Sequence, residues 1–418
     1  MESCHPREIE LGLERVRAVQ ARLGLTTAPF AVVTVAGTNG KGSTVAFAEN
    51  MLRAGGYRVG AYFSPHVFRY NERVRIDGAE VSDAALCEAF AQADAARGET
   101  SLTYFEFGTL AAMALFRAAK VEIAVLEVGL GGRLDAVNAW DADVAVLTAI
   151  GLDHMDWLGP DRESIGREKA GIFRAKRPAV CGDANPPPSV HAAATALEVP
   201  LYQYNRDFFA EQQPGGWRWR CPALNETWHA LPPPAMRGAY QYQNAATALM
   251  ALALLKDRFP LDRNAVRAAL TDTILTARFQ ALPGTPLTIV DVAHNGQAAE
   301  ALARDLKAHA IPGRTLAVVG MLKDKPIDAV LATMSPVVDE FFFGDLTGAR
   351  AASAAQLATA LATVAAQKRC HVHADVIGAY RAARAAAAPH DRIVVFGSFL
   401  TVSAILAAAD KAGGVDAR

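Results

Sequence analysis

Short apolar runs alternate along the chain with longer stretches that have the length and composition of helices. Three continuous apolar runs lie in the first part of the chain: AVVTVA (31–36), VEIAVLEV (121–128) and DVAVLTAI (143–150). Runs of this kind are typical of parallel strands buried on both faces. Helices are expected at 44–54, 83–96 and 107–119. This alternation predicts an α/β fold with a parallel sheet covered by helices.

The same alternation returns late in the chain, at LTIVDVA (287–293), RTLAVVG (314–320) and RIVVFGS (392–398). The chain before it is rich in proline and tryptophan, and we expect a small β-rich excursion near residues 180–236. We therefore predict an N-terminal domain over residues 1–280 and a C-terminal domain over residues 284–418. The hinge is expected near 281–286, at ALPGTP.

The composition excludes several classes of protein. The 418 residues are 51% hydrophobic and 20% charged, and the formal net charge of −1 offers no basic surface to nucleic acid or to an anionic membrane. The longest apolar run is about half of a bilayer span, and the N-terminus lacks the apolar segment of a signal peptide. Five scattered cysteines without a CxxC pair fit a reducing compartment: Cys4, Cys87, Cys181, Cys221 and Cys370. We expect a cytoplasmic protein.

The segment VAGTNGKGST (35–44) lies between a predicted strand and a predicted helix. Its small residues let backbone N–H groups converge on an anion at a helix N-terminus, where Lys41 can reach a phosphate. The hydroxyl of Ser43 or Thr44 can bind Mg²⁺. The spacing departs from the P-loop template, because two residues rather than four separate the glycines and a glycine follows the lysine. The alternative is a glycine turn with a solvated lysine.

Polar residues also follow other predicted strands. Glu127 ends one strand, and the next strand leads into GLDHMDWLG, which contains Asp153, His154 and Asp156. Open α/β sheets bind ligands at the carboxyl ends of their strands, and a carboxylate there suits Mg²⁺. The alternatives are a salt bridge for Glu127 and a structural role for His154. Lys169, in REKAGIF, is either a solvated helix lysine or a lysine modified by CO₂.

A similar group of residues occurs in the second half of the chain. LTIVDVAHNG places Asp291, His294 and Asn295 at a strand end, and TARFQ places Arg278 just before the predicted hinge. An arginine and an aspartate suit the phosphates and ribose of a nucleotide. A structural Arg–Asp pair is the alternative.

Eight segments, taken together and in order, resemble the bifunctional dihydrofolate synthase/folylpolyglutamate synthase family, a relative of the Mur peptidoglycan ligases. They are VAGTNGKGST, FSPHVFRYNERVRIDG, LTYFEFGTLAAMALF, EVGLGGRLDAVN, LDHMDWLGPDRESIGREKAGIF, RFQ, DVAHN and VVGMLKDK. The resemblance runs from about residue 9 to about residue 402. It implies a two-domain, Mur-ligase-like α/β fold, with a P-loop mononucleotide-binding N-terminal domain and a smaller Rossmann-like C-terminal domain.

The same resemblance implies an ATP-dependent ligase. ATP phosphorylates a carboxylate, and the amine of L-glutamate attacks the acyl phosphate to give an amide, ADP and phosphate. The implied substrates are dihydropteroate, folates, L-glutamate and ATP, handled by a monomer without nucleic-acid or membrane partners. Two Mg²⁺ ions and a monovalent cation are the implied ions.

The resemblance also implies roles for individual residues. The implied ATP contacts are Gly40, Lys41, Gly42, Ser43, Asn244, Arg278 and Asp291. The implied metal ligands are Ser43, Ser64, Glu127 and His154. The implied catalytic residues are Lys41, a carbamylated Lys169 and His294 on the phosphate side.

LTYFEFGTLAAMALF (102–116) resembles the segment that forms the dihydropteroate pocket of the bifunctional enzymes. Tyr104 and Phe105 could flank a pterin ring by stacking, and Glu106 could accept hydrogen bonds from its N–H groups. Ordinary packing at a helix start is the alternative for the two aromatic residues.

Three other functions are considered. A monofunctional folylpolyglutamate synthase is the nearest. A Mur-type ligase is disfavoured because Gly42, rather than a hydroxyl residue, follows Lys41, and because only about 30 residues precede the loop. A nucleotide-binding regulatory module that has lost catalysis is disfavoured because Lys41, Glu127, His154 and Lys169 are all present.

Overall fold

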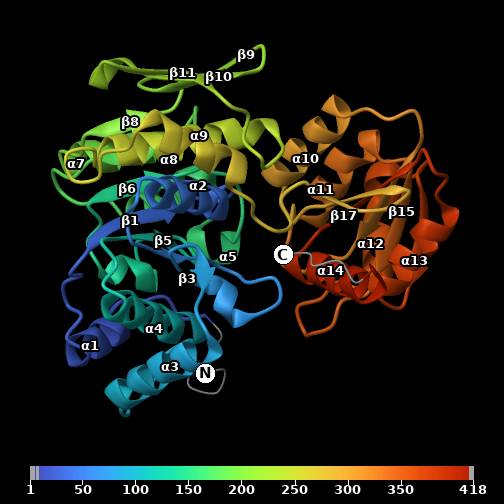
Figure 1. Ribbon diagram of the computed structural model, residues 1–418. Helices are drawn as coiled ribbons and strands as arrows, with labels where there is room; N and C mark the ends of the chain where they lie inside the picture. Colours follow the sequence, from blue (N-terminus) through green and yellow to red (C-terminus); the bar gives the residue numbers. More distant parts are fainter. Residues whose placement is uncertain (1–4, 6–8, 414–418) are drawn as a thin grey trace. The chain divides into compact units, whose positions relative to one another are not determined.

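The computed structural model describes residue 5 and residues 9–413 and divides into two compact units. The first unit contains the chain up to Gly151 together with Met155–Ala235 and Tyr240–Ile274. The second contains the chain from Leu275 onward together with two short segments, Leu152–His154 and Met236–Ala239. Each unit is built on its own sheet (Figure 1).

The first unit contains an eight-stranded sheet in the order β4-β3-β2-β5-β1-β6-β7-β8. Its strands are β1 (Ala31–Ala36), β2 (Val59–Tyr62), β3 (Val74–Ile76), β4 (Ala79–Glu80), β5 (Ile123–Glu127), β6 (Val144–Leu147), β7 (Ala179–Cys181) and β8 (Leu201–Gln203). The strands from β2 to β8 in this order are parallel, whereas β3 and β4 add an antiparallel edge. Every residue of β1, β5 and β6 is buried, as the continuous apolar runs predict.

Helices cover this sheet, and their bounds are α1 (Glu14–Arg22), α2 (Lys41–Ala54), α3 (Asp83–Arg97), α4 (Tyr104–Ala118), α5 (Met155–Leu158), α6 (Arg162–Ala170), α7 (Pro188–Ala196), α8 (Ala239–Ala253) and α9 (Arg263–Asp272). The helices expected at 44–54, 83–96 and 107–119 correspond to α2, α3 and α4. Two of the three begin earlier than predicted, because α2 starts at Lys41 and α4 at Tyr104.

The β-rich excursion is shorter than the predicted 180–236. It is a three-stranded antiparallel sheet of β9 (Phe209–Gln213), β10 (Gly216–Cys221) and β11 (Glu226–Leu231). Strands β7 and β8 and helix α7 belong instead to the main sheet and its cover, because β7 and β8 continue its parallel ladder. Trp219 attaches the excursion to α8, where its indole N–H donates to the carbonyl of Ala246 at 3.2 Å.

The second unit contains a six-stranded sheet in the order β12-β13-β17-β14-β15-β16. Its strands are β12 (Gln280–Leu282), β13 (Leu287–Val290), β14 (Thr315–Val319), β15 (Glu340–Gly344), β16 (Arg369–His373) and β17 (Arg392–Phe396). All but β12 are parallel. The helices are α10 (Gly296–Ala308), α11 (Ile327–Met334), α12 (Ala354–Ala365), α13 (Val376–Ala386) and α14 (Phe399–Gly413).

The hinge expected at 281–286 lies inside the second unit. Strand β12 pairs antiparallel with β13, so the glycine and prolines of this segment form the turn of a hairpin rather than a connection between units. The chain enters the second unit earlier, between Ile274 and Leu275. Proline and glycine occur in turns inside domains as well as in connections between them. The predicted hinge, which relied on these residues, is therefore too late in the chain.

Four cysteines in the described part of the chain are free thiols: Cys87, Cys181, Cys221 and Cys370. Cys4 lies outside the described residues. Burial raises the pKa of the Cys181 thiol to about 12, which keeps this thiol protonated and unreactive. In the residues that the structure describes, no helix has the length and apolar character needed to cross a membrane.

Candidate active site

The glycine-rich segment forms a tight loop between β1 and α2. Gly40 is the N-cap of α2 and has a φ of +89°, in the left-handed region that favours glycine. A Cβ atom at Gly40 would lie 2.5 Å from Oδ1 of Asn244, which comes from α8. The structure therefore brings Asn244, predicted to contact ATP, directly against the loop. Gly42 and Ser43 lie in the first turn of α2, and both are buried.

Hydrogen bonds to the chain after β6 hold the shape of this loop. The backbone N–H of Thr38 donates to the carbonyl of Ala149 at 2.7 Å, and the hydroxyl of Thr148 donates to the carbonyl of Asn39 at 2.7 Å. The Thr38 hydroxyl exchanges hydrogen bonds with the backbone of Gly151, each at 3.0 Å. These hydrogen bonds within the protein fix the shape of the loop.

Two lysine side chains share one carbonyl oxygen of the loop. The ammonium of Lys41 donates to the carbonyl of Gly37 at 3.1 Å, and the ammonium of Lys169 donates to the same oxygen at 2.9 Å. Lys169 comes from α6 and is only 4% exposed, so it is not a solvated helix lysine. Two cations at one carbonyl repel each other.

Two of the predicted metal ligands lie side by side. Glu127, at the end of β5, is 4% exposed, and its Oε2 accepts the backbone N–H of Ser64 at 3.0 Å. Ser64 follows β2, which is the neighbour of β5 in the sheet. The carboxyl ends of adjacent parallel strands have thus brought together two residues that are far apart in the sequence.

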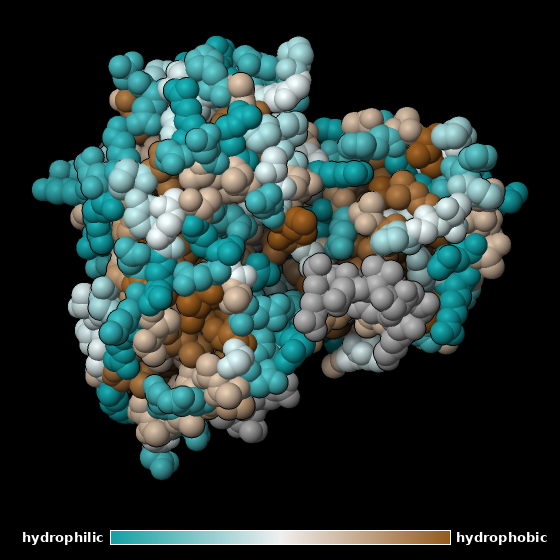
Figure 2. Space-filling view, viewed as in Figure 1, coloured by the Kyte–Doolittle hydropathy of each residue, from teal (hydrophilic) through white to brown (hydrophobic). Residues whose placement is uncertain are grey.

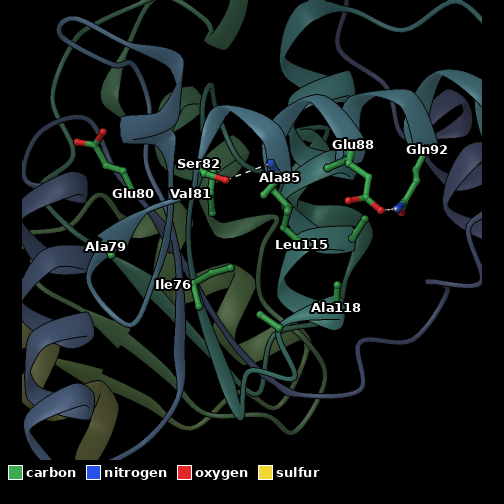
Figure 3. A pocket seen from close by; sticks show the side chains of 13 residues that line it. Ile76, Ala79, Glu80, Val81, Ser82, Ala85, Glu88, Gln92, Leu115 and Ala118 are labelled. Carbon is green, nitrogen blue, oxygen red and sulfur yellow. Dashed lines mark hydrogen bonds between the residues drawn. The ribbon is translucent and has the colours of Figure 1, made fainter.

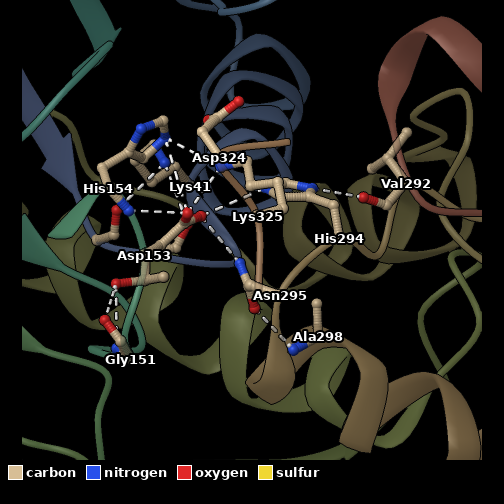
Figure 4. A network of polar contacts seen from close by, with 12 residues as sticks. Lys41, Gly151, Asp153, His154, Val292, His294, Asn295, Ala298, Asp324 and Lys325 are labelled. Atoms are coloured by element: carbon tan, nitrogen blue, oxygen red, sulfur yellow. Dashed lines mark hydrogen bonds and ion pairs between the residues drawn. The ribbon is translucent and has the colours of Figure 1, made fainter. Parts of the chain in front are cut away.

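His154 belongs to the second unit, where it lies next to a polar network (Figure 4). Its φ is +51°, which costs a residue other than glycine about 1 kcal/mol. The preceding carboxylate stabilises this conformation, because Oδ1 of Asp153 accepts the backbone N–H of His154 at 2.9 Å. Asp156, the third polar residue of this segment, is exposed on α5.

Both ring nitrogens of His294 have protein partners. Nδ1 lies 2.7 Å from the carbonyl oxygen of Val292, and Nε2 lies 3.3 Å from Oδ2 of Asp153. Asn295 caps α10 by accepting the N–H of Ala298, and its amide donates to Asp153 at 3.1 Å.

Arg278 and Asp291 occupy the same part of the second unit. The carboxylate of Asp291 is 7% exposed and accepts the backbone N–H groups of Phe279 and Ala293, each at 2.8 Å. Burial raises the pKa of Asp291, while the charge of Arg278 opposes the rise. The guanidinium of Arg278 lies over the ring of Phe399, 5.5 Å from its centroid.

The residues expected to bind a pterin lie at the start of α4. The ring of Tyr104 packs edge-on against that of Tyr70, at a centroid distance of 5.5 Å. The ring of Phe105 lies 5.8 Å from that of Tyr62 and covers Gly129, where a Cβ atom would meet it at 2.7 Å.

Both carboxylate oxygens of Glu106, which the sequence predicts to accept hydrogen bonds from a pterin, already accept hydrogen bonds within the protein. It is 4% exposed and closes a capping box, in which Oε2 accepts the backbone N–H of Thr103 at 2.7 Å. The guanidinium of Arg15 donates to both of its oxygens, at 3.0 and 3.3 Å. The carboxylate is therefore a helix cap and the partner of an arginine.

Four residues that were not selected as sites from the sequence stand out in the structure. Asp153 and Lys325 form a buried pair, with 2.7 Å between Oδ1 and Nζ. Arg73, 8% exposed, lies within 5.5 Å of the ring centroids of Tyr70 and Tyr104. Asp135 is a buried carboxyl group near Lys41, within the segment EVGLGGRLDAVN. Only its position in that motif could have marked it in the sequence.

Asp135 makes the stability of the first unit depend on pH. Burial raises its pKa from 3.8 to about 7, although backbone N–H groups and the charge of Lys41 oppose the rise. Between these two values the unfolded chain releases the proton and the folded chain keeps it, so the free energy of unfolding falls as pH rises. Asp135 lowers the free energy of unfolding by about 4 kcal/mol in total as the pH rises from 3.8 to about 7. Above that pH its contribution no longer changes.

We expect Asp135→Asn to lose this pH dependence. Its melting temperature, relative to that of the wild type, should rise as the pH is raised from about 4 to about 8 in calorimetric scans. Asp94→Asn is the control, because this carboxylate is 58% exposed. An unchanged difference in melting temperature between wild type and Asp135→Asn across this range would contradict the raised pKa.

A groove of about 380 Å³ lies elsewhere in the first unit (Figure 3). It is lined by the β3–β4 hairpin, α3 and the C-terminal half of α4, whereas Tyr104 and Phe105 lie at the N-terminal end of that helix. Its walls are mostly small and apolar, and Figure 2 shows hydrophobic surface over this part of the unit. The groove is thus separate from the residues described above.

Family models match segments of both units of the chain. Residues 35–207 match the Mur ligase middle domain, and residues 277–399 match the Mur ligase, glutamate ligase domain. The dihydrofolate synthase/folylpolyglutamate synthase of Escherichia coli (strain K12) is 46% identical over 417 residues, covering 99% of this chain and 95% of the relative.

Solved structures give the same result. The structure of E. coli FolC in complex with DHPP and ADP superimposes with a TM-score of 0.92 at 45% identity, covering 98% of this chain and 96% of that one. A bifunctional folylpolyglutamate synthase/dihydrofolate synthase with Mn, AMPPNP and L-glutamate bound gives a TM-score of 0.89 at 48% identity, with coverages of 97% and 95%. Because the identity extends over nearly the whole of each chain, this protein belongs to the dihydrofolate synthase/folylpolyglutamate synthase family of the Mur ligases.

Proposed function

We propose that this chain is an ATP-dependent ligase that adds L-glutamate to 7,8-dihydropteroate and to the glutamate tail of folates. Phosphorylation of the acceptor carboxylate by ATP converts a poor electrophile into an acyl phosphate and releases ADP. The amine of glutamate then attacks the acyl carbon, and the tetrahedral intermediate collapses to an amide and inorganic phosphate. The observation that carries this proposal is the loop after β1, at which Lys41, Lys169 and Asn244 converge.

The loop fits the phosphates of a nucleotide. Gly40 has no Cβ atom that would obstruct Asn244, and the N-terminus of the 14-residue helix α2 lies directly behind it. We assign Gly40, Lys41, Gly42 and Ser43 to the phosphates. Lys41 would leave the carbonyl of Gly37 for a phosphoryl oxygen and neutralise charge that develops during transfer.

The donor set fits a hard divalent cation such as Mg²⁺. The hydroxyls of Ser43 and Ser64 and the carboxylate of Glu127 are oxygen donors, the kind that Mg²⁺ prefers. Among the described residues, 5 and 9–413, no group of three or more His, Cys, Asp or Glu side chains is suited to a metal ion. We assign His154 as a nitrogen ligand of a second Mg²⁺. When bound, such ions withdraw charge from the transferring phosphoryl group.

In the second unit we assign Arg278 and Asp291 to ATP and His294 to the phosphate side. The carboxylate of Asp291 is fixed by two backbone N–H groups, and Phe399 supports the guanidinium of Arg278. His294 has a protein partner at each ring nitrogen, so it would act from a fixed position.

We assign Tyr104 and Phe105 to the pterin ring of dihydropteroate, because aromatic faces stack on flat heterocycles. Glu106 contributes indirectly, by capping the helix that presents both rings. We further propose that the protein acts as a monomer in the cytoplasm, where free thiols such as those of Cys87 and Cys370 stay reduced.

The test is phosphate release from ATP measured with each combination of substrates. We expect release only when L-glutamate is present with an acceptor, and we expect both dihydropteroate and tetrahydrofolate to serve as acceptors. Mass spectrometry of the products should show addition of one glutamyl residue to dihydropteroate. If tetrahydrofolate gives product and dihydropteroate does not, a monofunctional folylpolyglutamate synthase is favoured. Nucleotide binding without phosphate release would contradict a ligase.

A further inference from the structure

The carboxylate of Asp153 accepts hydrogen bonds from several segments of the second unit (Figure 4). Oδ1 accepts from Nζ of Lys325 at 2.7 Å and from the backbone N–H of His154 at 2.9 Å. Oδ2 accepts from the amide of Asn295 at 3.1 Å and lies 3.3 Å from Nε2 of His294. Both histidines to which we assign roles in the reaction therefore depend on one carboxylate.

Lys325 supplies the counter-charge. It lies between β14 and α11, and its side chain is 6% exposed, while that of Asp153 is 7% exposed. Its ammonium also lies 3.4 Å from Nε2 of His154. A buried charge that loses its partner is strongly unfavourable, so the two charges hold each other in place.

We propose that Asp153 and Lys325 form a positioning pair that sets the geometry of His154 and His294 for glutamate ligation. The proposal rests on the function given above and adds two residues to its site. Neither residue needs to contact substrate, because each acts through a histidine.

Each oxygen of the carboxylate has its own effect. Through Oδ1, Asp153 stabilises the left-handed backbone of His154, whose φ is +51°, and so fixes the direction of its side chain. Through Oδ2, it holds the ring of His294, whose other nitrogen lies against the carbonyl of Val292. Partners of this kind around a metal-binding histidine commonly change metal affinity or activity 10–100-fold when they are removed.

The experiment compares Lys325→Met, Lys325→Arg and Asp153→Asn with a control in the same loop, Lys323→Met. Lys323 is exposed, and its ammonium donates to the carbonyl of Ala349 at 3.4 Å. We expect kcat to fall about 10–100-fold in Lys325→Met and Asp153→Asn, with KM for ATP and for L-glutamate changed less than about threefold. Lys325→Arg should recover most of kcat because the charge remains, and Lys323→Met should match the wild type.

A readout that does not need turnover is the affinity for Mn²⁺ in the presence of AMPPNP, followed by electron paramagnetic resonance. We expect it to weaken about tenfold in Asp153→Asn and to stay unchanged in Lys323→Met. The double variant Asp153→Asn/Lys325→Met should melt closer to the wild type than Lys325→Met does, because it leaves no buried charge unpaired.

Two results would refute the proposal that Asp153 and Lys325 position the two histidines. In the first, Lys325→Met keeps both the kcat and the Mn²⁺ affinity of the wild type. In the second, Lys325→Met raises KM for one substrate at unchanged kcat and Lys325→Arg does not restore it, which would mean direct contact with that substrate. A wild type without glutamate-dependent phosphate release would instead refute the proposed function, while the Mn²⁺ affinities of the variants would still test the positioning of His154.

Discussion

Lys169→Ala is expected to reduce kcat about a thousandfold while leaving the melting temperature within a few degrees of that of the wild type. Lys169 is buried on α6, and its ammonium donates to the carbonyl of Gly37 in the loop that we assign to the phosphates. We propose that it reacts with CO₂ to form a carbamate, which presents a carboxylate at this position. Alanine leaves the loop without that negative charge.

The two lysines at Gly37 give the physical reason for a carbamate. Two ammonium groups at one carbonyl oxygen repel each other, whereas a carbamate on Lys169 would attract Lys41. The attraction between the carbamate and Lys41 would be appreciable because Lys169 is shielded from water, which weakens electrostatic interactions.

Rescue by small carboxylates tests this assignment. Acetate or propionate in the assay should restore part of the kcat of Lys169→Ala, since either can occupy the space left by the side chain. Arg167→Ala is the matched control, because Arg167 lies on the same helix and is exposed. A fully active Lys169→Ala would contradict any role for a carbamate, and so would an inactive Lys169→Ala that no carboxylate rescues while Arg167→Ala remains active.

The main sheets could be predicted because their central strands are apolar without interruption. Strands β1, β5 and β6 in the first unit and β13, β14 and β17 in the second all fall within runs recognised in the sequence. Strands β7 and β8 could not be recognised, because three residues such as Ala179–Cys181 contain too little periodicity to separate a strand from a loop. Because the sequence around β7 and β8 is rich in proline, these strands were included in the predicted excursion, which therefore begins too early.

The same contrast holds for the candidate site. Glu127 and Ser64 lie close together because adjacent parallel strands end at one edge of the sheet, a rule that can be applied to the sequence. The pairing of Asp153 with Lys325 joins residues 172 positions apart through loops, and no local pattern predicts it. The capping role of Glu106 could have been predicted from the sequence, because Thr103 and Glu106 have the spacing of a capping box.

Lys41→Met is the second change with a large expected effect. We expect kcat to fall about a thousandfold, because a hydrophobic side chain of similar length removes the cation assigned to the transferring phosphoryl group. Lys41→Arg should fail as well, since a planar guanidinium does not fit the space that the ammonium occupies beside Gly37 and Thr38. Lys176→Met is the control, because that side chain is 76% exposed.

Lys41→Met also has a signature that does not require turnover. The charge of Lys41 lowers the pKa of Asp135, so its removal should raise that pKa further above about 7. In the wild type, the free energy of unfolding falls with rising pH until about pH 7. In Lys41→Met it should continue to fall to a higher pH, as measured by chemical unfolding between about pH 4 and about pH 9. A variant that lost activity without this shift would have lost it for a reason other than the removal of a charge beside Asp135. An active variant would mean that another cation neutralises the phosphoryl group, because methionine cannot.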